Sequence, residues 1–181
     1  FSQPKKIVST SIPYKKELEQ AKKDLLYDKK FDESIVVDEK SIQARAKEII
    51  INKIEDTYLM HIMYEKLLTV ITKYKELYPE IDLTSDPWEF TQMRFKHFKP
   101  HHAFNSWHSE HSRIRADRIL GIQIYLTDHN CGTEFYNGSV IQSKVGRLTM
   151  FPCYFTHTHR GQVCPENKDR YLLTGYYNYI F

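Results

Sequence analysis

The feature that most constrains the fold of this chain is a change in hydrophobic periodicity near Pro87. Upstream, between residues 39 and 78, apolar residues recur every three or four positions, as they do on the buried face of a helix. Downstream, most clearly in residues 118–128, apolar residues occupy every second position, as in a strand with one buried face. We therefore expect helices in the first part of the chain to pack on a sheet formed by the second part.

The helical pattern of residues 39–78 predicts two helices, with a break near Asp56, and the second should end before Pro79. Their expected buried positions are Ile42, Ala46, Ile49, Ile50 and Ile54 in the first helix and Leu59, Ile62, Met63, Leu67, Val70, Ile71 and Tyr74 in the second. A further helix-compatible stretch spans residues 14–27, within a polar, lysine-rich segment.

Short strands separated by turn-forming residues are expected after Pro87. They are residues 118–128, 148–151, 154–159 and 171–181, with turns at residues 128–132 and at Asn137-Gly138. This pattern predicts a mostly β fold with N-terminal helices, in which a jelly-roll (double-stranded β-helix) barrel is supported by the helices. Residues 1–86 would be an N-terminal extension and supporting helices of the same domain, and residues 87–181 would form the barrel core.

Composition restricts the partners and the compartment. The formal net charge is only +3, and acidic residues lie among the lysine pairs, which favours a solvated surface over a nucleic-acid site. The three cysteines, Cys131, Cys153 and Cys164, are an odd number without CxxC spacing, so we expect no disulfide framework and a reducing compartment. The sequence has no signal-peptide pattern and no bilayer-spanning apolar run, which predicts a cytoplasmic protein without a membrane partner.

Two distant segments carry residues typical of a metal site. His108 and Glu110 lie two positions apart, and so do His157 and His159. Alternate residues of a strand point to the same face, so each pair can reach one ion. Two imidazoles and one carboxylate leave three positions of an octahedral metal open, which suits non-haem Fe(II). From the spacing alone, either His157 or His159 could be the third ligand.

Arg170 follows His159 by eleven positions, which allows a turn through residues 165–168 and a return on the next strand. On that strand Arg170 and Thr174 have the same parity and should point together into the barrel. A buried arginine is costly without a partner, and a dicarboxylate ligand would supply one in bidentate fashion. The alternative is an internal salt bridge to an aspartate or glutamate.

Two other classes of protein fit some of these residues. A non-catalytic or zinc-binding cupin-like protein could use His108, His111, Cys153 and His157 as ligands. A nucleic-acid-interacting module would use the lysine pairs and the 13 tyrosines. Arg170 distinguishes a site for a carboxylate ligand from a zinc site, because a zinc site has no use for an arginine aimed at its open face.

Downstream of Glu89 the chain carries six short segments in unbroken order: residues 107–110 (WHSE), 124–126 (IYL), 132–135 (GTEF), 146–152 (GRLTMFP), 155–161 (FTHTHRG) and 170–176 (RYLLTGY). Together they resemble the Fe(II)- and 2-oxoglutarate-dependent dioxygenases, and within them the prolyl-4-hydroxylase-like group common in bacteria, phages and large viruses. The resemblance implies hydroxylation of a C–H bond of a peptidyl (prolyl-like) or free amino-acid side chain, so the partner would be a peptide or small-molecule substrate. The implied cofactors are Fe(II), 2-oxoglutarate and O2, with ascorbate as an optional reductant and succinate and CO2 as co-products.

The resemblance also implies roles for individual residues. The metal ligands would be His108, Glu110 and His159, and His159 is preferred over His157 because of its distance to Arg170 and the Arg160-Gly161 that follows it. The remaining roles are 2-oxoglutarate binding by Arg170, Tyr125 and Thr174, and a place beside the ligands or in the cavity wall for His157, Phe104, Trp107 and Phe98.

Two positions depart from the family pattern. The carboxylate ligand is Glu110, where aspartate is commoner, and its extra methylene would shift the metal or the strand. Phe98 stands where many relatives carry a tyrosine near the co-substrate, so one hydrogen bond would be lost while the ring can still wall the pocket.

Overall fold

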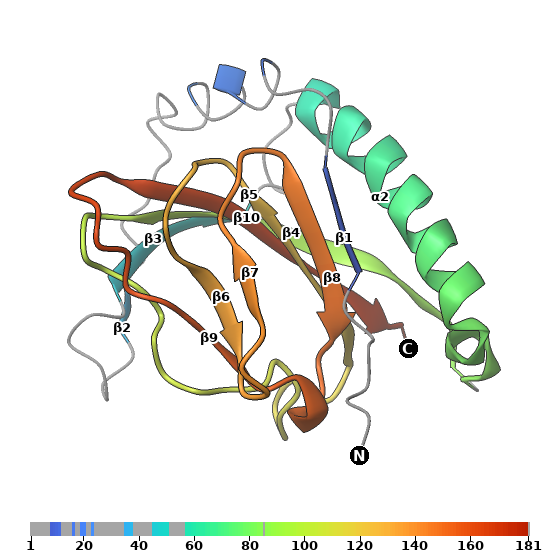
Figure 1. Cartoon of the computed structure of the whole chain (residues 1–181). Coiled ribbons are helices and arrows are strands. Elements are labelled where there is room, and N and C mark those ends of the chain that lie inside the picture. Colours follow the sequence, from blue (N-terminus) through green and yellow to red (C-terminus); the bar gives the residue numbers. More distant parts are fainter. Residues whose placement is uncertain are drawn as a thin grey trace.

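Two antiparallel sheets form the body of the protein in the computed structural model, which describes residues 8–11, 16, 19, 20, 23, 35–37, 45–50, 57–84 and 86–180. The large sheet has the strand order β1-β8-β5-β10-β4-β3-β2 and the small sheet the order β7-β6-β9 (Figure 1). The strands are β1 (Val8–Ser11), β2 (Ile35–Val37), β3 (Arg45–Ile50), β4 (Trp88–Phe98), β5 (Arg118–Tyr125), β6 (Gly132–Phe135), β7 (Val140–Gln142), β8 (Arg147–Pro152), β9 (His159–Gly161) and β10 (Arg170–Tyr179).

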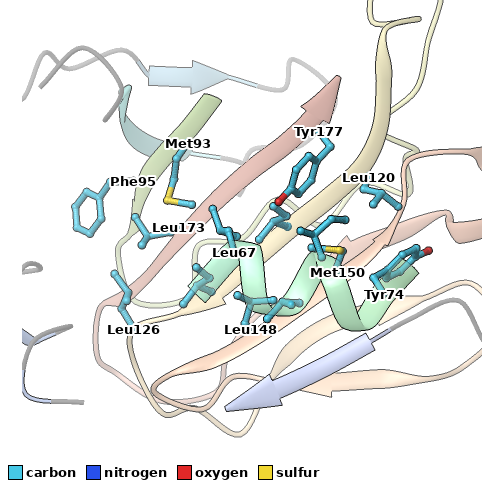
Figure 2. Packing of buried hydrophobic residues seen from close by; sticks show 14 residues of the cluster. Leu67, Tyr74, Met93, Phe95, Leu120, Leu126, Leu148, Met150, Leu173 and Tyr177 are labelled. Atoms are coloured by element: carbon cyan, nitrogen blue, oxygen red, sulfur yellow. The ribbon is translucent and has the colours of Figure 1, made fainter. Parts of the chain in front are cut away.

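The helix α2 (Thr57–Leu77) covers one face of the large sheet. It ends before Pro79, as predicted, and the 3-10 helix η2 (Pro79–Leu83) follows it. Leu67, Val70, Ile71 and Tyr74 of the predicted stripe are buried in the core, and Figure 2 shows Leu67 and Tyr74 over the sheet residues. The sheet side of this core comprises Met93, Phe95, Leu120, Ile122, Ile124, Leu126, Leu148, Met150, Leu173 and Tyr177.

The opposite face of the large sheet carries the polar groups. Leu173 of β10 belongs to the core under α2, so Leu172 and Thr174, its neighbours in the strand, point the other way. The same parity holds in β5, where Ile122 and Ile124 face the helix and Gln123 and Tyr125 face away. The small sheet contributes Thr133, His159 and Gly161 to the cavity on that face.

One predicted helix is wrong. Residues 45–50, expected as part of a helix upstream of Asp56, form β3, which pairs with β4 through Lys47–His97 and Ile50–Arg94. Helix propensity is a weak preference, and pairing with the otherwise open edge of β4 outweighs it. In the predicted helix over residues 14–27, the described residues Lys16, Glu19, Gln20 and Lys23 are helical, and the remainder lies outside the described residues.

The mostly β character of the second part is confirmed, but the described residues do not form a closed barrel. Strand pairing in the described part of the chain gives two separate sheets. The expected strand at residues 154–159 is also wrong in part, because Phe155–His157 form the 3-10 helix η3 and β9 begins only at His159. The predicted turn at Asn137-Gly138 is confirmed: it joins β6 to β7, and Gly138 has a φ of 86°, which favours glycine.

The prediction that the cysteines are unpaired is wrong for two of them. Cys131 and Cys164 form a disulfide across 33 positions of sequence, with their Cα atoms 5.1 Å apart, whereas Cys153 is free and buried. The pairing of β6 with β9 explains it, since Thr133 lies opposite Gly161 and the two cysteines flank this ladder. Sequence spacing contains no information on that register. Within the described residues, no helix is both long enough and apolar enough to cross a membrane.

Candidate functional site

A cavity lies on the face of the large sheet that α2 leaves uncovered. Its wall combines β4, β5 and β10 of the large sheet, β6 and β9 of the small sheet, and the segment between β4 and β5. The lining residues are Lys96, Phe98, Phe104, His108, Glu110, Gln123, Tyr125, Thr133, His159, Gly161, Arg170, Leu172 and Thr174.

Backbone pairing brings the two histidine segments together. His108 and His159 form an isolated antiparallel bridge, in which each backbone N–H donates to the other residue's carbonyl, at 3.0 and 2.9 Å. Their rings are consequently adjacent, with centroids 4.5 Å apart. Glu110 lies in a bend two residues later, so the strand geometry expected for residues 108–110 holds only at His108.

The backbone also fixes which nitrogen of each ring faces the site. Nδ1 of His108 is 2.9 Å from the carbonyl oxygen of Ser106, and Nδ1 of His159 is 2.9 Å from that of His157. A carbonyl can only accept, so each Nδ1 carries a proton. Each neutral ring therefore presents the lone pair of Nε2, as metal-binding histidines commonly do.

The carboxylate of Glu110 faces these lone pairs. Its Oε1 lies 3.5 Å from Nε2 of His108 and 3.7 Å from Nε2 of His159. Three acceptors facing one point repel one another unless a cation or added protons lie between them. Donor atoms bound to one metal at about 2.1 Å stand about 3.0–3.4 Å apart, so small side-chain adjustments suffice. The trio can thus hold a metal ion, and its donor atoms all lie within 4.8 Å of one another.

Two residues outside the predicted set hold the other oxygen of Glu110. The guanidinium of Arg118 and the hydroxyl of Tyr176 both donate to Oε2, each at 2.8 Å. The Arg118 guanidinium also stacks on the Tyr176 ring, 3.6 Å from its centroid. Burial raises the pKa of Glu110, but when protons rather than a metal occupy both Nε2 atoms, hydrogen bonds and charges from His108 and His159 outweigh burial and lower that pKa well below its usual range. The carboxylate is thus ionised and aimed at the imidazoles.

Arg170 lies in the same cavity and has no carboxylate partner within the described ranges. Its Nη1 contacts the carbonyl oxygen of Gln162 at 3.2 Å and the sulfurs of Cys131 and Cys164 at 3.5 and 3.6 Å. Its Nε is buried without a hydrogen-bond partner. Burial lowers the pKa of Arg170 to about 10, so the group remains charged at neutral pH. The internal salt bridge considered from the sequence is absent from these residues, and an anionic ligand would satisfy the guanidinium.

The two predicted hydroxyls differ in their surroundings. Oγ1 of Thr174 is buried without a hydrogen-bond partner, so it is available to a ligand. The hydroxyl of Tyr125 already donates to Oγ1 of Thr133 at 2.7 Å, and Thr133 donates to Oε1 of Gln123 at 2.6 Å. Burial raises the pKa of Tyr125, which keeps the phenol neutral. Its hydroxyl must turn away from Thr133 to reach a ligand.

The four predicted wall residues do not share one environment. Phe98 and Phe104 line the cavity, with Phe98 packed 4.8 Å from the Arg170 guanidinium and Phe104 4.5 Å from the His108 ring. Trp107 lies outside the lining, where it packs on Tyr136 and beneath Arg160. His157 also lies outside the lining, and it touches the site through the carbonyl that accepts from His159.

The alternative zinc ligands are not assembled. His108, His111, Cys153 and His157 do not form one of the converging donor groups in the described part of the chain. His111 stacks instead on Tyr154, and Cys153 is buried beside the core.

Sequence reasoning missed Arg118, Tyr176, Gln123 and Thr133. Tyr176 shares strand parity with Arg170 and Thr174, and Gln123 is polar in an apolar strand, so both left a weak signal. Thr133 left only its place in the segment 132–135, and Arg118 left no signal, because their roles depend on the pairing of two sheets and on the path of the loop before β5.

Comparison with known proteins identifies solved structures that share this architecture. No family model matches the sequence, and a search of curated proteins gives no match either. Among solved structures, the viral collagen prolyl hydroxylase of Paramecium Bursaria Chlorella virus-1, in a 2-oxoglutarate complex, is similar with a TM-score of 0.70 and 11% identity, covering 98% of each chain. A Pseudomonas putida prolyl-4-hydroxylase is similar with a TM-score of 0.67 and 13% identity over 97% of this chain and 93% of that one.

A third similar structure is a prolyl hydroxylase from Trichoplax adhaerens in complex with a hypoxia inducible factor peptide fragment. Its TM-score is 0.74 at 13% identity, over 97% of this chain and 84% of that one. Identities this low establish similarity of fold, and the fold agrees with the resemblance carried by the six sequence segments. The chain has the prolyl-4-hydroxylase-like fold of the 2-oxoglutarate oxygenases.

Proposed function

We propose that this protein is an Fe(II)- and 2-oxoglutarate-dependent hydroxylase. The observation that carries the proposal is that one cavity contains both a converging His108–Glu110–His159 donor set and a buried, charged Arg170 without a carboxylate partner among the described residues. A metal site alone would explain the first feature, and only an anionic ligand beside that metal explains both.

Each residue of the cavity would have its own role in binding the metal or the co-substrate. His108, Glu110 and His159 hold the metal and leave the cavity side of it open. Arg170 binds the distal carboxylate of 2-oxoglutarate, and the Thr174 hydroxyl donates to it. The aromatic rings of Phe98 and Phe104 exclude water from this region. When bound, Fe(II) with 2-oxoglutarate and O2 supplies oxidative decarboxylation to succinate and CO2 and hydroxylation of a C–H bond.

The proposed substrate is an amino-acid side chain, in a peptide or free, with a prolyl-like residue preferred. Support comes from the collagen prolyl hydroxylase and from the peptide-bound Trichoplax enzyme that share the fold. We would test this proposal by incubating the iron-loaded protein with proline-containing peptides and with free amino acids, measuring succinate and a mass gain of one oxygen atom.

The site itself is tested by anaerobic titration of the metal-free protein with Fe(II) and 2-oxoglutarate, following the metal-to-keto-acid charge-transfer absorption. Wild type should develop the band, and Arg170→Leu should bind Fe(II) but not develop it at the same 2-oxoglutarate concentration. Arg115→Leu is the matched control, because Arg115 is exposed and lies outside the cavity lining. A band of equal strength in Arg170→Leu contradicts the proposal.

The histidine assignment has its own test. His159→Ala should abolish stoichiometric Fe(II) binding, whereas His157→Ala should retain it, because only the backbone carbonyl of His157 meets a ligand. The reverse result would move the third ligand to His157.

A further inference from the structure

A second cluster of donor groups lies behind Arg170, and the proposed chemistry does not use it. His129, Cys131 and Cys164 are all buried, and their donor atoms lie within 4.8 Å of one another. The two cysteines are joined as a disulfide in this structure. Nη1 of Arg170 touches both sulfurs, so this cluster and the cavity share one arginine.

The ring of His129 is fixed by its neighbours. Its side chain has no exposed surface, and its Nε2 lies 3.1 Å from the carbonyl oxygen of Asp169. A carbonyl cannot donate, so Nε2 carries the proton and Nδ1 of the neutral ring is a lone pair. This Nδ1 is buried and has no hydrogen-bond partner. A histidine whose distal N–H is held by a carbonyl, with the other nitrogen bare, has the arrangement typical of a metal ligand.

The carboxylate of Glu166 lies beside Nδ1 of His129. Its Oε1 accepts the backbone N–H of Asn130 at 2.6 Å, which aims Oε2 at Nδ1 of His129, 3.5 Å away. Oε2 is also buried without a hydrogen-bond partner. Two acceptors facing each other are unfavourable unless a proton or a metal cation lies between them.

We propose that the reduced protein binds a thiophilic divalent cation of the zinc class through His129, Cys131 and Cys164, whose donor atoms converge. Two thiolate sulfurs and one imidazole are ligands that zinc accepts, with a water molecule in the fourth position. Once the disulfide is open, the sulfurs need to separate to about 3.8 Å, the distance expected for metal–sulfur bonds of about 2.3 Å in tetrahedral geometry. The Cα atoms, 5.1 Å apart, allow this with side-chain rotation.

Metal binding at this site requires two steps, reduction of the disulfide and replacement of the thiol protons by the cation. A phosphine reductant and water convert the disulfide to two thiols, with the phosphine oxidised to its oxide and water supplying both protons. The cation then replaces the two thiol protons, which are released to solvent. Disulfide and metal therefore exclude each other at this site. Thiolate sulfurs accept stronger hydrogen bonds from Arg170 than disulfide sulfurs do, so the metal-bound form holds Nη1 more firmly.

The test uses Cd2+, whose bonds to thiolates absorb in the ultraviolet. The His108–Glu110–His159 set contains no sulfur, so Cd2+ bound there does not contribute, and the result does not depend on the proposed hydroxylase function. Phosphine-reduced wild type, kept anaerobic, should gain the thiolate absorption up to one equivalent of Cd2+ and show a native far-ultraviolet circular dichroism spectrum. Oxidised wild type should gain none.

Substitutions identify which cysteines bind Cd2+ and so produce the thiolate absorption. Cys131→Ser and Cys164→Ser should lose it, and His129→Gln should weaken Cd2+ binding by at least about tenfold. Cys153→Ser is the matched control and should leave it unchanged, since Cys153 is buried outside the cluster. The proposal is overturned if reduced wild type shows no thiolate absorption, if reduction unfolds the chain and Cd2+ does not refold it, or if the absorption follows Cys153. His129 and Glu166 would then be better described as an imidazolium–carboxylate ion pair that binds no metal.

Discussion

The hydroxyl of Tyr176 donates to Oε2 of Glu110 at 2.8 Å, across 66 positions of sequence. With Arg118 on the same oxygen, Tyr176 turns the other oxygen of the carboxylate toward the two imidazoles. The geometry makes Tyr176 a positioning residue for the proposed metal site, although it touches neither the cavity nor an imidazole.

Tyr176→Phe should therefore weaken metal binding while leaving the fold intact. The ring that stacks on Arg118 is kept, and only the hydrogen bond to Glu110 is lost. Loss of such a supporting partner typically costs about 10–100-fold in metal affinity. The dissociation constant for Mn2+ or anaerobic Fe(II) should rise by about tenfold, and Tyr179→Phe on the same strand should not change it. Equal affinity in Tyr176→Phe and wild type would remove Tyr176 from the site.

Thr174→Val should reduce affinity for 2-oxoglutarate without reducing stability. Oγ1 of Thr174 is buried without a hydrogen-bond partner, so its removal loses nothing in the free protein but loses one bond to the bound carboxylate. We expect a rise of about three- to tenfold in the dissociation constant, with Fe(II) affinity unchanged. Thr149→Val is the control, because its Oγ1 is equally buried and unpartnered but lies outside the cavity. A similar effect in both variants would assign the loss to packing.

Two adjacent leucines of α2 allow the contribution of burial to stability to be measured separately from that of helix propensity. Leu67 is 1% exposed in the core, whereas Leu68 is 64% exposed. Leu67→Ala should lower the free energy of unfolding by about 2–5 kcal/mol, because it leaves a cavity against the sheet. Leu68→Ala should change it by less than about 0.5 kcal/mol. Chemical denaturation measures both, and equal losses would mean that α2 does not pack on the sheet as described.

Stability should fall at alkaline pH partly through Tyr171. Burial, together with the hydrogen bond to Asp169, raises the pKa of Tyr171 to about 12. Between its ordinary value of about 10 and pH 12, the unfolded chain loses this proton while the folded protein keeps it, so stability decreases as pH rises through that window. Tyr171→Phe should make the decline shallower. Tyr136→Phe, at a tyrosine that is 75% exposed, should leave the slope unaltered.

Local periodicity predicted those parts of the molecule in which neighbours in sequence determine the structure. The alternation around Leu120 and Ile122 correctly indicated β5, and the stripe through Leu67 and Tyr74 correctly indicated α2. Residues 45–50 were mispredicted because their pattern suits a helix, and only the open edge of β4 makes them a strand.

The candidate site was also predicted only in part, where residues close in sequence determine it. The sequence indicated that His108, Glu110 and His159 would come together, and the structure brings their donor atoms within 4.8 Å. The reasoning for Glu110 was incomplete, since this residue lies in a bend and is aimed by Arg118 and Tyr176. The disulfide of Cys131 with Cys164 was not predictable, because it depends on how β6 and β9 align across 33 positions.

The central place of β10 has a consequence for how the chain is made on the ribosome. This strand joins β4 to β5, yet it is synthesised after all the other strands described here. Until Arg170–Tyr179 emerge, β4 and β5 each present an unpaired edge, a state prone to wrong association. The nascent chain also lacks Arg170, Thr174 and Tyr176 at that stage. The proposed metal site is therefore complete only after β10 has paired, because Tyr176 of that strand holds the Glu110 carboxylate.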